Sequence, residues 1–198
     1  DMRLELLSAG LALTMLAAAC GPARPATGAE GAKTEAPAAA DPAAEEKQKQ
    51  AEQKAVFDAL AGDEAKIDDL ADTGNGFALF HRGSARLKSP EYTVQQGGFE
   101  DMEAAVKAGN ADAQLWVGTR MAYGLEGYQL KPNSGLMMLE KAANQDHIEA
   151  ILAVGLMYEQ DTFMHDVAKA KTWYERGAAL GSDKAKDALA KLGKQEDF

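Results

Sequence analysis

The chain has 198 residues, with 31 Asp and Glu against 21 Lys and Arg, and its formal net charge is −10. This acidity, without any Lys/Arg-rich stripe, argues against a nucleic-acid-binding protein and against docking of the protein surface on an anionic membrane. The single cysteine excludes an intrachain disulfide framework and a cysteine-rich metal site.

Residues 1–19 are predicted to form a secretory signal peptide. An apolar run over 4–19 follows Arg3 and ends in small residues, which is the pattern of a basic start, an apolar segment and a cleavage site. The run is shorter than the roughly 20 apolar residues of a transmembrane helix, and it contains Glu5. The alternative, a buried amphipathic helix, is less favoured because the run lacks a polar stripe.

Cys20, the only cysteine, follows this run directly. The segment Leu16-Ala17-Ala18-Ala19-Cys20 resembles the lipobox of bacterial lipoproteins, with the leucine one residue further from the cysteine than usual. The resemblance implies cleavage before Cys20 and its lipidation, and several acyl chains give a stable anchor. Gly21 favours the outer membrane, since an aspartate there tends to hold lipoproteins at the inner one. We therefore expect a periplasm-facing envelope lipoprotein that contacts the membrane only through its N-terminal lipid.

Residues 20–44 are predicted to be a disordered tether, because they are rich in Ala and Pro and contain no large apolar side chain after Cys20. N-terminal helices follow over 45–76. The first, 45–61, is polar until its last two turns, so we expect its N-terminal half to project and the folded unit to start near residue 54. Asp63 is expected to cap a short second helix over 64–71.

Beyond residue 76 the chain repeats itself. Ala78, Ala113 and Ala150 lie 35 and then 37 residues apart, and each precedes a glycine by five residues. The small residues allow two helices to approach closely, and turn glycines end helices. We predict an all-α fold, a short α-solenoid of antiparallel helix pairs, over 77–193. The predicted helices are 77–87 with 91–108, 111–124 with 134–145, 148–160 with 167–180, and a capping helix 183–193 before a tail at 194–198. Ser134 and Asp166 are expected N-caps and Gly181 a C-cap.

The third unit carries the motif of a known family. It reads EAILAVGLMY over 149–158 and AKAKTWYERGAA over 168–179. This resembles the Sel-one-like repeat, a bacterial relative of the tetratricopeptide repeat. The second unit matches less closely, and the first keeps little beyond Ala78 and Gly83. The third departs from the family pattern in its interhelix loop, which lacks the usual glycines. The resemblance implies a protein-binding scaffold, often in the bacterial envelope, and names no partner.

The sequence indicates neither catalysis nor a cofactor. His147 falls at a turn where such repeats often carry a histidine, so a structural role is favoured, while His81 is expected to face solvent and His165 to lie in a loop. None has a second ligand at metal-binding spacing, and no nucleophile elbow, phosphate-binding loop or calcium loop is present.

A partner is expected on the concave face, which the first helix of each pair lines. Residues at the repeated alanine, four on and eight on are predicted to pack inward: Ala113, Val117, Met121, Ala150, Val154 and Tyr158. The neighbouring line of residues, with two loop aromatics, makes up the predicted binding surface: His81, Trp116, Thr119, Arg120, Tyr123, Leu156, Met157, Gln160, Tyr128 and Phe163. Ser84 and Lys88 lie on the same line. Trp and Arg are enriched at binding hot spots, but Trp116 has the alternative of packing on a neighbouring repeat. Trp173 and Tyr174 are expected in the core.

Two kinds of protein partner follow from these expectations. One is a toxin of an antibacterial secretion system, which would make the chain an immunity protein. The other is an envelope or polysaccharide assembly protein, which would make it a scaffold or regulator. An enzyme that uses His81 or His165 is a weaker alternative. A small-ligand carrier is weaker still, because it requires a deep apolar cavity, which three helix pairs do not readily enclose.

Overall fold

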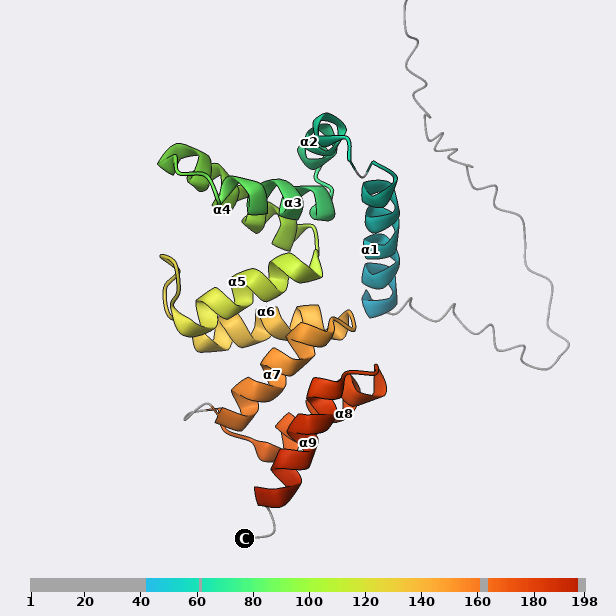
Figure 1. Cartoon of the computed structure of the whole chain (residues 1–198), viewed down its shortest axis with the longest axis vertical. Coiled ribbons are helices and arrows are strands. Elements are labelled where there is room, and N and C mark those ends of the chain that lie inside the picture. Colours follow the sequence, from blue (N-terminus) through green and yellow to red (C-terminus); the bar gives the residue numbers. More distant parts are fainter. Residues whose placement is uncertain (1–41, 61, 161–163, 196–198) are drawn as a thin grey trace, which may run out of the picture. The chain divides into compact units, whose positions relative to one another are not determined.

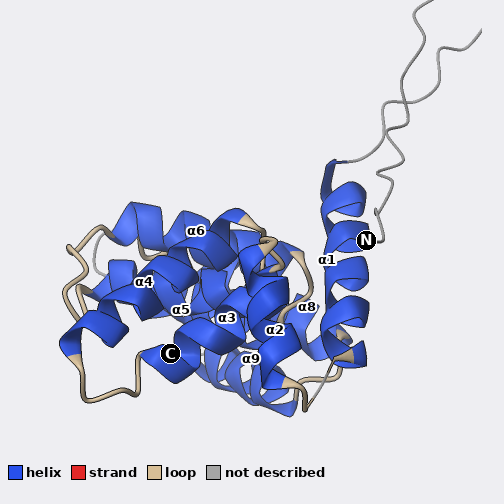
Figure 2. Cartoon of the chain, turned by 90° about the horizontal axis from the view of Figure 1, so that it is seen from above, coloured by secondary structure: helices blue, strands red, loops and turns tan. Residues whose placement is uncertain are grey.

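The structure is a computed structural model that describes residues 42–60, 62–160 and 164–195. The predicted signal peptide, Cys20, most of the predicted tether, Phe163 and the last three residues of the predicted tail lie outside the described residues. The described residues form only helices (Figures 1 and 2). Their bounds are α1 Pro42–Ala59, α2 Glu64–Asp72, α3 Gly76–Arg86, α4 Tyr92–Lys107, α5 Ala111–Tyr123, α6 Pro132–Asn144, α7 Ile148–Gln160, α8 Val167–Ala179 and α9 Asp183–Gln195.

The helices α3 to α8 form three antiparallel pairs that follow one another along the stack, and α9 closes it (Figure 1). The predicted α-solenoid is therefore confirmed, with helix bounds within two residues of those expected. No helix in the described part of the chain is long and apolar enough to cross a membrane.

One polar side chain in each turn between repeats caps the helix that follows. Asn75, Asn110, His147 and Ser182 accept a hydrogen bond from the backbone N–H three residues on, at 3.1, 2.8, 3.3 and 3.3 Å. The four donors are the alanines of the repeat register, Ala78, Ala113, Ala150 and a fourth, Ala185, and all four are fully buried. Because this fourth copy begins α9, the predicted capping helix corresponds to the first helix of a fourth unit. His147 has the structural role expected of it.

The residue before each cap takes a left-handed backbone conformation. It is glycine in three turns, with φ of 88° at Gly74, 88° at Gly109 and 91° at Gly181, which confirms Gly181 at the end of α8. The third turn uses Asp146 instead, at φ 63°. A non-glycine residue in this region costs about 1 kcal/mol or more.

Two side chains, Asp166 and Ser134, were predicted to cap the second helix of a pair. Asp166 accepts from the Lys169 N–H at 3.0 Å and caps α8 as expected. Ser134 was wrong as a cap: α6 begins earlier, at Pro132 after Lys131, because proline has no N–H to satisfy and its fixed φ suits the first helical position.

Small residues set the spacing within the pairs, as the repeat predicted. A Cβ on Gly118 would lie 3.1 Å from the Gly135 carbonyl oxygen, and one on Gly135 would lie 2.5 Å from the backbone N of Ala122. In the third pair the Tyr174 ring lies directly against Gly155. These contacts bring α5 against α6 and α7 against α8 closely enough to exclude any larger side chain at the glycines.

Most of the predicted core residues are buried. Ala113, Val117, Ala150 and Val154 are at most 4% exposed, whereas Met121 and Tyr158 are only partly buried. Tyr174 is buried in a cluster with Ala170 and Leu192, and Trp173, partly buried, packs against the cluster that contains Ala150 and Val154. A buried carboxylate, Asp101, joins the first pair by binding Arg82 of α3 through both oxygens, at 2.9 and 3.0 Å.

Helix α1 lies along the turns between repeats (Figure 1), and this corrects the prediction that its N-terminal half projects. Gln53 accepts from the Gly76 N–H at 2.9 Å, Gln50 donates to the Ala108 carbonyl at 2.9 Å, and Lys47 forms a 2.6 Å ion pair with Asp146. The prediction was wrong because it took the polar composition of α1 as a sign of solvent exposure. In the structure, polar side chains of α1 bind backbone and carboxylate groups of the repeats.

Candidate functional site

The first of two adjoining hollows lies where α1 and α3 meet the start of α5. It has a volume of about 350 Å³ and mainly aromatic and apolar walls. The rings of Phe57 and Phe77 are 6.3 Å apart between centroids, and Phe57 is 5.7 Å from the His81 ring. The lining is completed by Phe80, Ser84, Ala85, Lys88 and Asp112.

The second hollow continues along the same side of α3 toward α5, with a volume of about 310 Å³. Ser84 and Lys88 line both hollows, and Trp116 and Arg120 form the α5 side of the second. We call the two together the α3–α5 groove. The predicted line of residues from His81 through Lys88 to Trp116 and Arg120 is thus brought together on one surface.

Some charged groups of the α3–α5 groove have an oppositely charged partner within the structure, and one does not. Arg120 forms a two-point ion pair with Glu126, at 2.8 and 3.0 Å, and Asp112 contacts His147 at 3.0 Å. Among the described residues, no carboxylate pairs with Lys88 and no group bonds the Ser84 hydroxyl. The groove therefore presents one unpaired hydroxyl, on Ser84 of α3, and one unpaired ammonium, on Lys88 in the turn after α3.

Trp116 packs against a neighbouring repeat, which was the predicted alternative to a role in partner binding. Its ring lies 6.1 Å from that of Phe99 on α4 and 6.0 Å from that of Tyr128 in the α5–α6 loop. The Arg120 guanidinium stacks 3.4 Å from the indole centroid. Trp116 is still partly exposed and lines the groove, so it is both a packing residue and a wall of the site.

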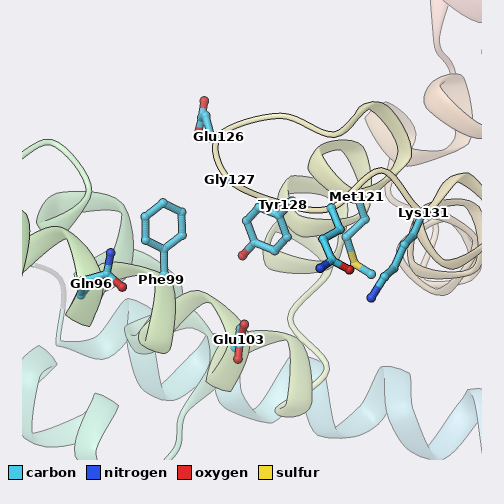
Figure 3. Close-up of a pocket in the computed structure, with 9 residues that line it drawn as sticks. Gln96, Phe99, Glu103, Met121, Glu126, Gly127, Tyr128 and Lys131 are labelled. Carbon is cyan, nitrogen blue, oxygen red and sulfur yellow. The ribbon is translucent and has the colours of Figure 1, made fainter.

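A third hollow, of about 340 Å³, lies between α4 and the α5–α6 loop (Figure 3) and shares Glu126 with the second hollow. Phe99, Glu103, Met121 and Tyr128 line it. The Tyr128 hydroxyl oxygen is buried, and it has no hydrogen-bond partner among the described residues. Burial, and then the Glu103 carboxylate, raise the pKa of Tyr128.

The remaining predicted partner residues are more scattered. Thr119 donates its hydroxyl to the Leu115 carbonyl at 2.8 Å, and Tyr123 is 52% exposed at the end of α5. On α7, Leu156 is 40% exposed and Gln160 is exposed. Met157 was wrong as a surface residue, since it is only 3% exposed and packs in the core. Its helix is buried on two sides by α6 and α8, which a three-residue step along the sequence does not reveal.

Several residues of these hollows were not predicted. Phe57, Phe77 and Phe80 line the first hollow, and Phe99 and Glu103 the third. Phe57 belongs to a helix outside the repeats, so the repeat register gave no position for it. Phe99 lies on the second helix of the first unit and contacts Trp116 on the first helix of the next. Predicting it would have required the contact between these two helices to be expected from the sequence.

The described residues contain no group of three or more His, Cys, Asp or Glu arranged to hold a metal ion. His147 is committed to its cap and to Asp112, and that hydrogen bond raises its pKa. His81 is 3.8 Å from the Glu64 carboxylate on the rim of the first hollow. Both histidines therefore contact carboxylates within the described part of the chain.

Fold and site together define a class of protein: an α-solenoid of helix pairs that presents an aromatic groove along consecutive repeats. No protein-family model matches the sequence, and no curated protein matches it significantly. Solved structures do match. One is a Sel1 repeat protein from Oxalobacter formigenes, 26% identical with a TM-score of 0.58, over 64% of this chain and 96% of that one.

A second match is c5321, a protective antigen present in uropathogenic Escherichia coli strains, which displays an SLR fold. It is 18% identical with a TM-score of 0.57, over 67% of this chain and 29% of that longer chain. The chain described here therefore has the Sel1-like repeat fold, which the family motif in its third unit predicted. This is the fold of a protein-binding repeat scaffold.

Proposed function

We propose that the chain is a non-catalytic scaffold that binds another protein in the α3–α5 groove, and that a lipid on Cys20 holds it at the bacterial envelope, facing the periplasm. The observation that carries the proposal is the groove itself, with aromatic walls on two repeats and an unpaired cation, Lys88, between them. Aromatic residues that bury apolar area beside a few well-placed polar groups are typical of binding hot spots.

The structure changes which residues are expected to supply the binding energy. Arg120 is occupied by Glu126 and stacks on Trp116, so its main effect is to hold the indole in place. Lys88 is the unpaired cation of the groove, and the Phe57 and Phe77 rings offer the apolar surface. We expect the bound segment to carry a carboxylate for Lys88 and an apolar side chain for the first hollow.

The form of this function that we favour is immunity to a toxin delivered by an antibacterial secretion system. The side-chain caps of α3 and α5 support a preformed groove, and a preformed surface loses little entropy on binding one partner tightly. A lipid-anchored chain would also meet a toxin in the compartment where the toxin acts. A scaffold for envelope assembly is the alternative, and the two differ in the consequence of deleting the gene.

The experiment is capture of partners by the full chain from the source cell, with mass spectrometry and paired variants. Lys88→Glu reverses the charge in the groove, and Lys107→Glu makes the same change on an exposed site of α4 outside it. We expect Lys88→Glu to weaken capture of the main partner at least tenfold, about 1.4 kcal/mol, and Lys107→Glu to leave it unchanged. Equal capture by both variants would remove the groove from the proposal.

Two further readouts separate the alternatives. Deletion that is harmful only when a toxin is delivered supports immunity, whereas an envelope defect without toxin supports the scaffold. Turnover that is lost on changing His81 or His165 would instead support an enzyme. For the anchor, globomycin should leave an uncleaved precursor, and a Cys20→Ala form that still fractionates with membranes would refute lipidation.

A further inference from the structure

The third hollow differs in charge from the α3–α5 groove. Glu103 of α4 is exposed, and among the described residues no cation pairs with it. The other carboxylate of the hollow, Glu126, is neutralised by its two-point ion pair with Arg120. Glu103 therefore supplies the unpaired negative charge of the third hollow.

The surroundings of Glu103 suit an organic cation better than a metal ion. Phe99 and Tyr128 form aromatic walls, with ring centroids 6.1 Å apart, and Met121 adds an apolar side chain. Aromatic faces attract Lys and Arg cations within about 6 Å, and carboxylates bind them by charge-assisted hydrogen bonds. A single carboxylate among rings lacks the several oxygen ligands that a divalent cation requires.

Among the described residues that line the hollow the one cation is Lys131, which lies at the opposite end from Phe99, with Glu103 between them in this view (Figure 3). Apart from Glu103, Lys131 and the paired Glu126, the lining residues are uncharged. The Tyr128 ring packs against Phe99 and Trp116 and its hydroxyl oxygen is buried, so this wall is part of the packed structure.

We propose that the third hollow binds a lysine or arginine side chain, with its charged end at Glu103 and its alkyl stem against Phe99 and Tyr128. The proposal extends the proposed function, because that side chain would come from the bound protein. The partner would then carry a carboxylate for the α3–α5 groove and a basic residue for the third hollow. Two sites of opposite charge would fix the orientation of the partner as well as its affinity.

The test uses small probes, so it does not depend on finding the partner. Nα-acetyl-arginine N-methylamide is titrated into the isotope-labelled full chain, and backbone amide shifts are followed by NMR. The matched probe is the citrulline derivative, which has nearly the same shape without the charge. We expect saturable binding of the arginine probe in the millimolar range, with the largest shifts at Phe99, Glu103 and Tyr128, and weaker binding at higher salt.

Paired variants locate the charge. Glu103→Gln keeps the shape of the side chain and should weaken binding of the arginine probe about fivefold or more. Glu100→Gln removes an exposed carboxylate from the same helix, outside the hollow, and should change nothing. Equal binding of the citrulline probe, equal effects of the two variants, or shifts spread over the acidic surface would each overturn the proposal. If the arginine probe binds as expected but no protein is captured through the groove, the proposed function fails and this site stands.

Discussion

The packing of α5 on α6 places the α5–α6 loop, and a single methyl group at Gly135 tests that relation. A Cβ at this position would lie 2.5 Å from the backbone N of Ala122, 2.7 Å from its Cα and 2.7 Å from the Gly118 carbonyl oxygen. All three atoms belong to the backbone, so no side chain can rotate to make room. Gly135→Ala must therefore push α5 and α6 apart.

The expected loss of stability is about 2 kcal/mol. Overpacking in a close-packed interior costs typically 1–3 kcal/mol, and the rigid neighbours place this site near the upper end. Replacing a helical glycine by alanine returns up to about 1 kcal/mol through helix propensity. For a domain of this size, about 2 kcal/mol lowers Tm by roughly 4–8 °C, which thermal unfolding followed by circular dichroism measures directly.

Gly193 of α9 provides the matched control, because a Cβ there meets nothing within 4 Å. Gly193→Ala should leave Tm unchanged or raise it slightly, by up to about 1 kcal/mol in stability. Trp116 fluorescence, recorded in a Trp173→Phe background, should change in Gly135→Ala only, since the indole packs on Tyr128 of the displaced loop. A Gly135→Ala protein as stable as Gly193→Ala would show that the α5–α6 spacing is not set by this glycine.

Three further predictions concern the third turn and the groove. Asp146→Asn removes the charge that pairs with Lys47 and Arg176, and should lower the free energy of unfolding by about 0.5–1 kcal/mol, because both ion pairs are partly exposed. Amide hydrogen exchange should become faster in α1. Unchanged exchange there would contradict the role of the Lys47–Asp146 ion pair. The pKa of His147 is raised by its hydrogen bond to Asp112, so its ion pair with Asp112 stabilises the fold below the unfolded pKa, near 6.5, and less as pH rises through the folded value. Protonation of Nδ1 ends the hydrogen bond that this nitrogen accepts from the Ala150 N–H, and this loss offsets part of the gain. Tm should therefore fall from about pH 6 to pH 8 more in the wild type than in His147→Asn, whose side chain can still cap α7; parallel curves would refute the linkage. Trp116→Phe should keep the packing on the neighbouring repeat and weaken partner capture less than Lys88→Glu does. Competition binding would measure both effects. A larger effect of Trp116→Phe would show that the indole supplies most of the binding energy.

The repeat register made most of the fold predictable. Alanines spaced by 35 and 37 residues, with a glycine five residues after each, require two helices in close contact, and the structure has them. The fourth alanine, Ala185, was recognisable by the same spacing from Ala150. It was missed because the glycine that follows the other three is absent from α9, where position 190 is alanine.

The site was only partly predictable, since it depends on contacts between units. The line from His81 to Arg120 follows helical periodicity and was found, whereas Phe57 reaches the first hollow from α1, outside the repeat. The pairing of Arg120 with Glu126 depends on the path of the α5–α6 loop, where Glu126 itself has a left-handed backbone with φ 49°. Periodicity places residues on a face, but it does not show which charges are already neutralised there.

The third turn shows how a departure from the repeat consensus serves the site. Where the other turns have glycine, Asp146 adopts a left-handed backbone conformation. Its carboxylate binds Lys47 of α1 and Arg176 of α8, each at 2.6 Å. Those ion pairs lower the pKa of Asp146, so the attachment persists at neutral pH. Together with Gln50 and Gln53, Lys47 fixes α1 along the turns, and α1 carries Phe57 to the wall of the α3–α5 groove. An acidic residue in the third turn thus offsets its local backbone cost by holding in place a helix that completes the binding surface.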